Sequence, residues 1–157
     1  MRVKNSFVRL PYGFDVNQLV TELNSFEEEC WMEHPSKMEG NSALPLVSHI
    51  GERNHKFEGQ MLPTEYLDKA SYMKQVMASF GEVLSRSRLM RLASGAEVSE
   101  HVDFNYHWHS RVRIHVPIKT NPDVTFHCGE NHVHMAAGEA WLFDSWRRHR
   151  VINAGRE

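Results

Sequence analysis

The sequence predicts a mainly β protein, a jelly roll with two N-terminal helices packed on its outside. Two observations point to this fold. From residue 82 onward, apolar and polar residues alternate in short segments separated by turn residues. Seven short strands at this spacing are typical of a sandwich or jelly roll. In the first half, by contrast, apolar residues recur at the three- and four-residue spacing of helices.

The length and composition favour a single domain over residues 1–157. A chain of 157 residues can bury one core, and 41% hydrophobic with 24% charged residues is ordinary for a globular protein. We divide the domain into a helical and loop part, 1–81, and a jelly-roll core, 82–157.

The charge, the N-terminus and the cysteines indicate the partners and the compartment. A formal net charge of −2 gives no reason to expect nucleic-acid binding, and no apolar run is long enough to cross a membrane. The N-terminus becomes polar too early for a signal peptide. Cys30 and Cys128 are far apart, so we expect two free thiols in a reducing compartment. We therefore expect a cytoplasmic protein with no nucleic-acid or membrane partner; the oligomeric state is not predicted.

The first half is expected to contain two strands and two helices. The first strand covers 3–10, and the first helix covers 16–29. Residues 30–60 are expected to be loops with a short strand near LPLVSHI. The second helix starts after its cap, Thr64, and ends at Gly81. One apolar stripe along it is expected to pack against a sheet: Tyr66, Leu67, Ala70, Met73, Val76, Met77 and Phe80.

The second half contains the seven expected strands and most of the histidines. Eleven histidines are present, and seven of them fall between His101 and His134, a density that suggests metal or proton chemistry. The expected strands are 83–92, 96–104, 111–119, 124–129, 132–138, 139–144 and 149–153.

His101, Asp103 and His149 are the candidate metal ligands. Residues two apart in a strand point to the same side, so His101 and Asp103 present an imidazole and a carboxylate to one point. His149 opens a later strand. Two histidines and one carboxylate on one face of a metal leave the opposite positions open, as in non-haem Fe(II) oxygenases. The alternative is a solvated strand face with an unrelated later histidine, because a His-x-Asp pair alone is a common pattern.

The strand 111–118 strengthens the metal interpretation. Its apolar residues fall on one side, and Arg113 and His115 fall on the other. A strand with one wet face is the ordinary explanation in an antiparallel sheet. However, an arginine fork suits a carboxylate, and His115 adds a donor. Beside a ferrous triad, this is what an oxo-acid co-substrate requires.

Other histidines are weaker candidates. His132 and His134 share a strand face but lack a third ligand, and His107 and His109 fall in an expected hairpin loop. We expect them on the surface or in a supporting position behind the ligands.

Three segments resemble the aspartyl/asparaginyl β-hydroxylase family of 2-oxoglutarate-dependent dioxygenases, a wider group that includes the bacterial cis-proline hydroxylases. They are SRLMRLASGAEVSEHVDF, RVRIHVPI and HMAAGEAWLFDSWRRHRVIN, in this order, within about Ser85 to Asn153. The resemblance implies a double-stranded β-helix, a cupin-like jelly roll. It also implies Fe(II) ligation by His101, Asp103 and His149, and 2-oxoglutarate binding by Arg113 and His115.

The chain departs from this family in two places. Animal aspartyl hydroxylases lack the carboxylate ligand, so Asp103 resembles the bacterial branch. The family also places an arginine further beyond the distal histidine, on a final strand, for the far carboxylate of 2-oxoglutarate. Arg156 is the only candidate here, and it comes early. We therefore expect a truncated chain whose jelly-roll core lacks its last strand.

The activity that the resemblance implies is hydroxylation of an unactivated carbon of an amino acid, free or in a peptide. Fe(II) is the expected cofactor, and 2-oxoglutarate and O2 are the expected co-substrates. A small molecule or a peptide is the expected partner. The alternative is a non-catalytic or zinc-binding cupin-like jelly-roll module, which needs the same strands but no arginine for a carboxylate.

Overall fold

A computed structural model describes residues 3–35, 37–81, 85–104 and 106–156. The chain forms two compact units. Unit 1 comprises Met1–Val16, Met38–Asn41 and Leu92–Glu157, and unit 2 comprises Asn17–Lys37 and Ser42–Arg91. Sheets dominate both units and the helices are few and short, which confirms the prediction of a mainly β fold consistent with a cupin-like jelly roll. The predicted single domain over 1–157 stays a prediction.

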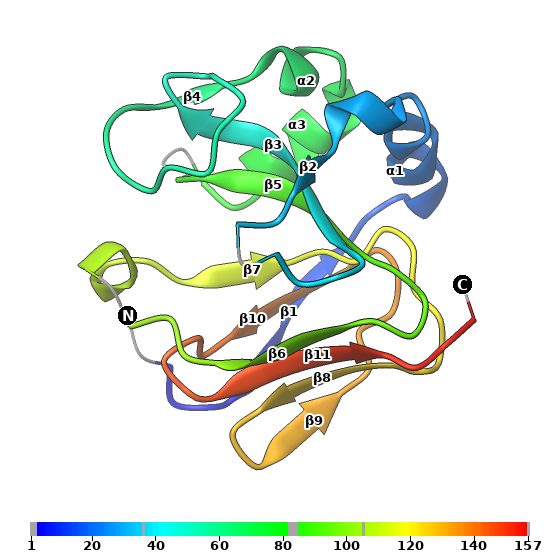
Figure 1. The fold of residues 1–157 in the computed structure, drawn as a ribbon, viewed down its shortest axis with the longest axis vertical. Coiled ribbons are helices and arrows are strands. Elements are labelled where there is room, and N and C mark those ends of the chain that lie inside the picture. The colour runs from blue at the N-terminus through cyan, green and yellow to red at the C-terminus, as the bar shows by residue number, and fades with distance from the viewer. Residues whose placement is uncertain (1–2, 36, 82–84, 105, 157) are drawn as a thin grey trace. The chain divides into compact units, whose positions relative to one another are not determined.

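Unit 1 consists of two antiparallel sheets (Figure 1). The first has the order β1 (Phe7–Gly13), β10 (Glu139–Phe143), β7 (Arg113–His115). The second has the order β6 (Glu97–His101), β11 (His149–Asn153), β8 (Val124–Cys128), β9 (Asn131–Val133). Ring contacts join them: Phe143 of β10 lies 6.0 Å from Phe126 of β8 and 5.2 Å from His149 of β11, between ring centroids. The two sheets therefore face each other across a shared core, as in a jelly roll.

A β-bulge sets the register of β6. His101 lies opposite His149 and Val98 lies opposite Val151, so three steps along β6 match two along β11. Residues directly opposite each other share a face of the sheet. The extra residue in β6 thus puts both Val98 and His101 on the face that carries His149. Simple alternation would have placed Val98 and His101 on opposite faces.

Unit 2 is a four-stranded sheet with short helices. The strand order is β2 (Met32–Glu33), β3 (Asn41–His49), β4 (Met61–Pro63), and β5 (Ser87–Leu92) also pairs with β3. The helices are α1 (Val16–Leu23), η1 (Glu28–Cys30), α2 (Glu65–Asp68) and α3 (Ser71–Ala78). Its core is mainly apolar, with Ser48 and Thr64 also buried. The buried hydrophobic residues are Leu19, Ala43, Leu44, Leu46, Val47, Tyr66, Leu67, Ala70, Met73, Val76 and Leu89.

The helices of unit 2 are shorter than predicted. The expected helix 16–29 ends at Leu23, and the expected second helix is broken into α2 and α3. Thr64 makes no side-chain cap; its hydroxyl donates to the carbonyl of Pro45 instead. The carboxylate of Glu22 accepts the N–H groups of Tyr72 and Met73 at the start of α3. This distant carboxylate stabilises a new helix start where the periodicity predicted a continuous helix.

The strands agree better with the prediction. Five of the seven expected strands in the second half appear with small shifts, and 111–119 shortens to β7 and 132–138 to β9. The expected strand 83–92 is seen as β5 from Ser87, and Val83 and Leu84 lie outside the described residues. β1 begins at Phe7 and not at residue 3, and β3 is a nine-residue strand that continues through Pro45.

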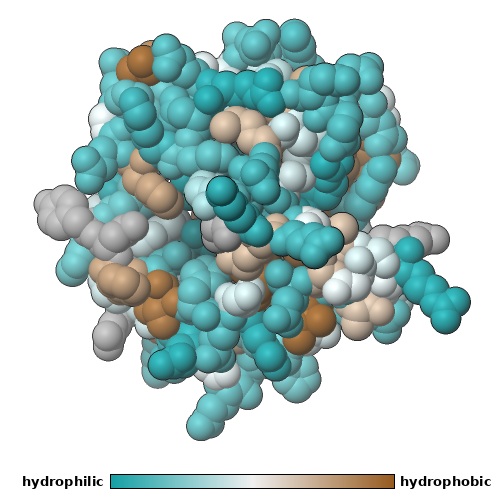
Figure 2. All heavy atoms as spheres, viewed as in Figure 1, coloured by the Kyte–Doolittle hydropathy of each residue, from teal (hydrophilic) through white to brown (hydrophobic). Residues whose placement is uncertain are grey.

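The surface carries no obvious apolar docking area on the face seen in Figure 2, which is mainly hydrophilic with small, separate hydrophobic patches. The large apolar side chains that are exposed among the described residues are Tyr12, Ile50, Leu62, Met90 and Phe104. Scattered residues of this kind are normal on soluble domains. In the described part of the chain, no helix has the length and apolar character needed to span a bilayer.

Candidate metal centre

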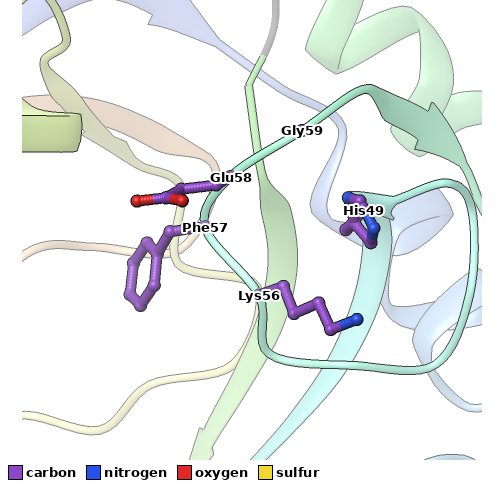
Figure 3. Close-up of a pocket in the computed structure, with 5 residues that line it drawn as sticks. All are labelled: His49, Lys56, Phe57, Glu58 and Gly59. Carbon is purple, nitrogen blue, oxygen red and sulfur yellow. The ribbon is translucent and has the colours of Figure 1, made fainter.

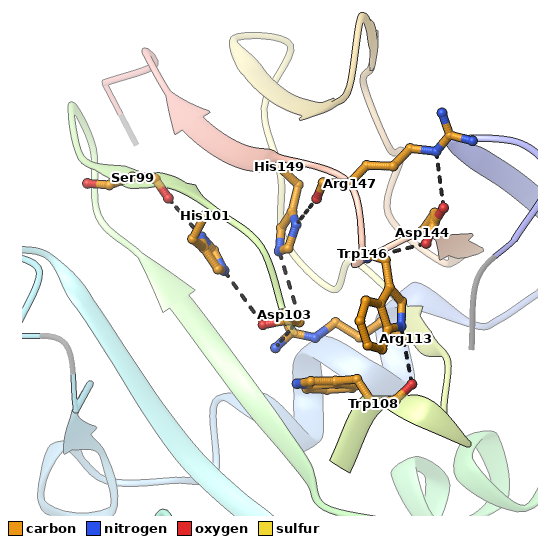
Figure 4. A network of polar contacts seen from close by, with 9 residues as sticks. All are labelled: Ser99, His101, Asp103, Trp108, Arg113, Asp144, Trp146, Arg147 and His149. Atoms are coloured by element: carbon orange, nitrogen blue, oxygen red, sulfur yellow. Dashed lines mark hydrogen bonds and ion pairs between the residues drawn. The ribbon is translucent and has the colours of Figure 1, made fainter. Parts of the chain in front are cut away.

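His101, Asp103 and His149 converge on one point of unit 1. One ligand atom from each lies within 4.8 Å of the other two. The two imidazoles face each other across the β6–β11 ladder, with ring centroids 4.2 Å apart. Figure 4 shows both rings pointing toward the carboxylate. Donor atoms at this spacing can share one ion, because first-row metal–ligand bonds are about 2 Å long.

Asp103 reaches this point by a route that strand alternation does not describe. β6 ends at His101, so the predicted strand 96–104 is too long and Asp103 lies in the segment that follows. Its backbone N–H donates to the carbonyl of Ser145, at 2.9 Å. This bond to the turn before β11 holds the carboxylate beside the two histidines.

The hydrogen bonds of the two imidazoles determine their tautomers. Nδ1 of His101 lies 2.8 Å from the carbonyl oxygen of Ser99, and Nδ1 of His149 lies 2.9 Å from that of Arg147. A carbonyl oxygen only accepts, so each Nδ1 carries a hydrogen, and in the neutral ring the lone pair lies on Nε2. Metal-binding histidines are commonly oriented by such a bond on the other ring nitrogen.

The triad contains buried polar atoms that the protein itself does not satisfy. Nε2 of His149 and Oδ2 of Asp103 are buried without a hydrogen-bond partner in the described residues, and they lie 3.9 Å apart. Burial lowers the pKa of His149, outweighing the hydrogen bond to the Arg147 carbonyl that raises it, so its imidazole is neutral. A neutral lone pair beside an unsatisfied carboxylate oxygen suits a cation. This donor set fits a divalent iron ion.

Arg113 is the cation nearest the triad. Its Nη2 lies 3.1 Å from Oδ2 of Asp103, an ion-pair distance without hydrogen-bond geometry. The guanidinium carbon lies 4.6 Å from the ring centroid of Trp108 and 6.0 Å from that of Phe143. Burial lowers the pKa of Arg113 and the charge of Asp103 opposes the shift; a guanidinium nevertheless stays protonated. The site therefore presents a fixed positive charge on aromatic walls.

The other two predicted co-substrate residues differ in position. His115 lies on the inner face of β7, 4.7 Å from the ring of Phe126 on the facing sheet. β11 begins at His149 and ends at Asn153, and Arg156 lies beyond that second end, exposed. The carbonyl of the preceding residue, Gly155, accepts the Ser94 hydroxyl. The structure thus brings Arg113 to the triad and His115 to the same core, but it does not bring Arg156 there.

The remaining histidines pair differently than expected. His132 lies opposite His127 in the β8–β9 ladder, with ring centroids 5.6 Å apart, whereas His134 follows the end of β9 and bonds the Val124 carbonyl through Nδ1. In the described part of the chain, no third metal-ligand side chain joins the His127–His132 pair. His107 is buried within the 3-10 helix η2 (Tyr106–His109), so it is not a surface loop residue.

Sequence reasoning missed the residues that orient the ligands. These are Ser99, Ser145 and Arg147, which act through backbone carbonyls, and Trp108, whose ring lies against Arg113. A backbone carbonyl leaves no side-chain signal. Asp144 was the one visible clue, because a charged residue directly after an apolar strand needs partners when it is buried.

A pocket in unit 2 lacks a converging set of groups. It has a volume of about 450 Å³ and is lined by His49 and residues 56–59 of the loop between β3 and β4. In Figure 3, Phe57 and Glu58 point to one side of this loop, and His49 and Lys56 lie on the other. No triad residue lines it, so the metal centre of unit 1 is the better candidate site.

Comparison with known families agrees with this geometry. Residues 50–157, more than half of the chain, match the family described as Aspartyl/Asparaginyl beta-hydroxylase. A search of curated proteins finds no match. The matched region includes all three triad residues and extends further toward the N-terminus than the segments that suggested the resemblance. The chain belongs to the aspartyl/asparaginyl β-hydroxylase family of iron- and 2-oxoglutarate-dependent hydroxylases.

Proposed function

We propose that this chain is an Fe(II)- and 2-oxoglutarate-dependent hydroxylase of the bacterial branch, acting on an unactivated carbon of an amino acid, free or within a peptide. One observation carries the proposal: two imidazole nitrogens and one carboxylate converge within 4.8 Å, and Nε2 of His149 and Oδ2 of Asp103 are buried without a hydrogen-bond partner in the described residues. Family membership supports the reaction class. The substrate class rests on that membership alone.

Each residue of the centre has a defined task in this proposal. His101 and His149 offer their Nε2 nitrogens to a metal, because backbone carbonyls hold their Nδ1 hydrogens. Asp103 supplies the single negative charge. When bound, ferrous iron supplies the redox chemistry that couples O2 activation to oxidative decarboxylation of 2-oxoglutarate. Three ligands on one face leave room for a co-substrate on the other.

Arg113 supplies carboxylate recognition. Its guanidinium lies beside Asp103 and against the rings of Trp108 and Phe143, so water contacts only part of it. A charge-assisted contact to a carboxylate is stronger in such surroundings than on an open surface. His115, on the same face of β7, is near enough along the strand to add a second donor.

The test combines metal binding with turnover. Purified protein loaded with Fe(II) is screened against free amino acids and short peptides, and 2-oxoglutarate-dependent succinate release is measured. We expect release with at least one substrate, and loss of release in Asp103→Ala. Tight Mn(II) binding without any 2-oxoglutarate binding contradicts the hydroxylase proposal while leaving the metal centre intact.

A second candidate is a zinc-binding or non-catalytic cupin-like module. The position of Arg156 favours it, because this residue is exposed and lies beyond the end of β11, away from the triad, where it is not placed to bind the far carboxylate of 2-oxoglutarate. Such a module predicts zinc in the purified protein and no heat signal when 2-oxoglutarate is titrated into it. Metal analysis followed by that titration separates the two candidates.

A further inference from the structure

A single turn connects two of the three triad residues. The turn runs from Asp144 to Arg147, between β10 and β11, and the Arg147 N–H donates to the Asp144 carbonyl at 3.0 Å. The carbonyl of Ser145 accepts the N–H of Asp103, and the carbonyl of Arg147 accepts Nδ1–H of His149, each at 2.9 Å. The direction of these two carbonyls therefore sets where the carboxylate and the imidazole lie. Figure 4 shows the contact between the Arg147 carbonyl and His149.

The Asp144 side chain holds this 144–147 turn together. Only 2% of Asp144 is exposed. Its Oδ1 accepts the N–H of Trp146 at 3.3 Å, and its Oδ2 accepts Nε–H of Arg147 at 3.1 Å. Arg147 also donates through Nη2 to the carbonyl of Lys4, and Asp144 donates its own N–H to the carbonyl of Ser6. One carboxylate thus bonds the turn at two points, and the turn is bonded to the segment before β1.

Stability alone gives a weak reason for this buried charge. A buried ion pair often contributes no more to stability than an apolar pair of similar size, because desolvation offsets the attraction. Arg147 is itself 44% exposed along its side chain, which weakens the pair further. The carboxylate does have a specific effect: it holds the peptide group between Ser145 and Trp146, which carries the Ser145 carbonyl, and it holds the side chain of Arg147.

We propose that Asp144 is a positioning residue of the metal centre, which acts through the carbonyls of Ser145 and Arg147 on Asp103 and His149. The inference rests on the proposed function only in that the triad holds a divalent metal. His101 is oriented by Ser99 of its own strand and is independent of the turn. Removal of a partner that orients a metal ligand typically costs 10–100-fold in metal affinity. Asp144 acts one contact further from the metal, so we expect its removal to lower metal affinity about tenfold.

The test compares divalent-metal affinity among variants of the turn. Mn(II) is titrated calorimetrically into wild type, Asp144→Asn, Asp144→Ala and Arg147→Ala, well below each melting temperature. Asn keeps one acceptor for Trp146 but loses the acceptor for Arg147, so the dissociation constant should rise in the order Asp, Asn, Ala. Because Asp144 and Arg147 act as a unit, Arg147→Ala should add little to Asp144→Ala in the double variant.

A control variant separates positioning from general stability. Asn153→Ala removes a buried side chain on the same strand as His149, with bonds to the carbonyls of Leu92 and Ala93. It should lower the melting temperature without changing Mn(II) affinity. The Co(II) absorption spectrum should shift in the Asp144 variants and stay constant in Asn153→Ala.

Two outcomes overturn the inference. One is unchanged Mn(II) affinity and Co(II) spectrum in Asp144→Asn and Arg147→Ala, even if wild type turns over substrate. The other is an equal change in Asn153→Ala, which would make the effect a general loss of stability. Wild type that binds Mn(II) but not 2-oxoglutarate refutes the hydroxylase proposal alone, because the titration needs no co-substrate. If Asp144→Ala fails to fold, Asp144→Asn and Arg147→Ala still test whether the turn positions the ligands, because Arg147 is half-exposed and its replacement disturbs the core less.

Discussion

Two histidine pairs lie across neighbouring strands of the same sheet, and only one of them has the features of a metal site. His101 and His149 are opposite each other on β6 and β11, with rings 4.2 Å apart; His127 and His132 are opposite each other on β8 and β9, with rings 5.6 Å apart. The first pair faces the core, next to Asp103. Among the residues that the structure describes, no carboxylate joins the second pair in a metal-ligand group, and Arg150 lies opposite His127 on β11.

The difference shows what a cross-strand histidine pair needs to hold a metal. In the inner pair each Nδ1 bonds a backbone carbonyl, so both lone pairs are fixed at Nε2. Among the described residues, none holds either ring of the outer pair by a hydrogen bond; His127 is half-buried and His132 is exposed. A cation at the outer pair also meets the positive charge of Arg150. Orientation, a carboxylate and burial distinguish the two sites, since the residue type is the same.

The largest expected effect is on the carboxylate of the inner pair. Asp103→Ala should lower Mn(II) affinity by at least about a hundredfold, because it removes a charged ligand and leaves the two histidines beside the uncompensated charge of Arg113. Calorimetric titration measures this loss. Asp123→Ala, in the turn before β8, is the matched control and should bind like wild type. Similar affinity for Mn(II) in wild type and Asp103→Ala would show that the inner pair holds no ion through this carboxylate.

The next effect concerns Arg113, the cation that lies beside the inner pair and against the ring of Trp108. Replacing Arg113 with Ala should weaken 2-oxoglutarate binding to the Mn(II)-loaded protein by about ten- to a hundredfold, corresponding to roughly 1.5–3 kcal/mol for a charge-assisted contact. Arg113→Lys keeps the charge but loses the planar fork, so it should also bind more weakly than wild type. Titration of 2-oxoglutarate, with melting temperatures measured alongside, tests both variants. Equal affinity in all three proteins contradicts the carboxylate-binding role.

A smaller gain is expected when the outer pair is given the carboxylate it lacks. Arg150→Glu removes the repulsive charge and places an acid across from His127. Equilibrium dialysis against Zn(II) should then find a second ion per chain, bound more weakly than the first because the outer rings are not oriented. The same substitution combined with His132→Ala should return the stoichiometry to one. If Arg150→Glu itself binds only one ion per chain, then the outer pair fails to bind metal because it lacks burial and orientation, and not because it lacks an acid.

The sequence predicted the strands of this site better than the contacts that complete it. Period-two alternation is local, so β8, β10 and β11 appear close to their predicted bounds. The placement of Asp103 depends on the Ser145 carbonyl, more than forty residues later in the chain, and the start of α3 depends on Glu22, about fifty residues earlier. The bulge in β6 similarly becomes visible only when β11 is paired with it. Each of these features is a contact between distant segments, which a spacing pattern does not encode.

The smallest effect should come from removing the outer pair. His127→Gln with His132→Gln should leave Mn(II) affinity at the inner pair within about twofold, since Gln keeps the polar surface and neither residue contacts the triad.

Burial, then Arg150 and His132, lower the pKa of His127. A histidine whose pKa is lowered in the folded state binds protons more readily when unfolded, so the free energy of unfolding falls as the pH drops through the unfolded-state pKa of about 6.5. The double variant should therefore lose less stability than wild type between about pH 7 and 5, by under about 0.5 kcal/mol as expected for surface residues. Urea unfolding at several pH values measures the difference; a steeper acid dependence in the variant would reverse the sign assigned to this pair.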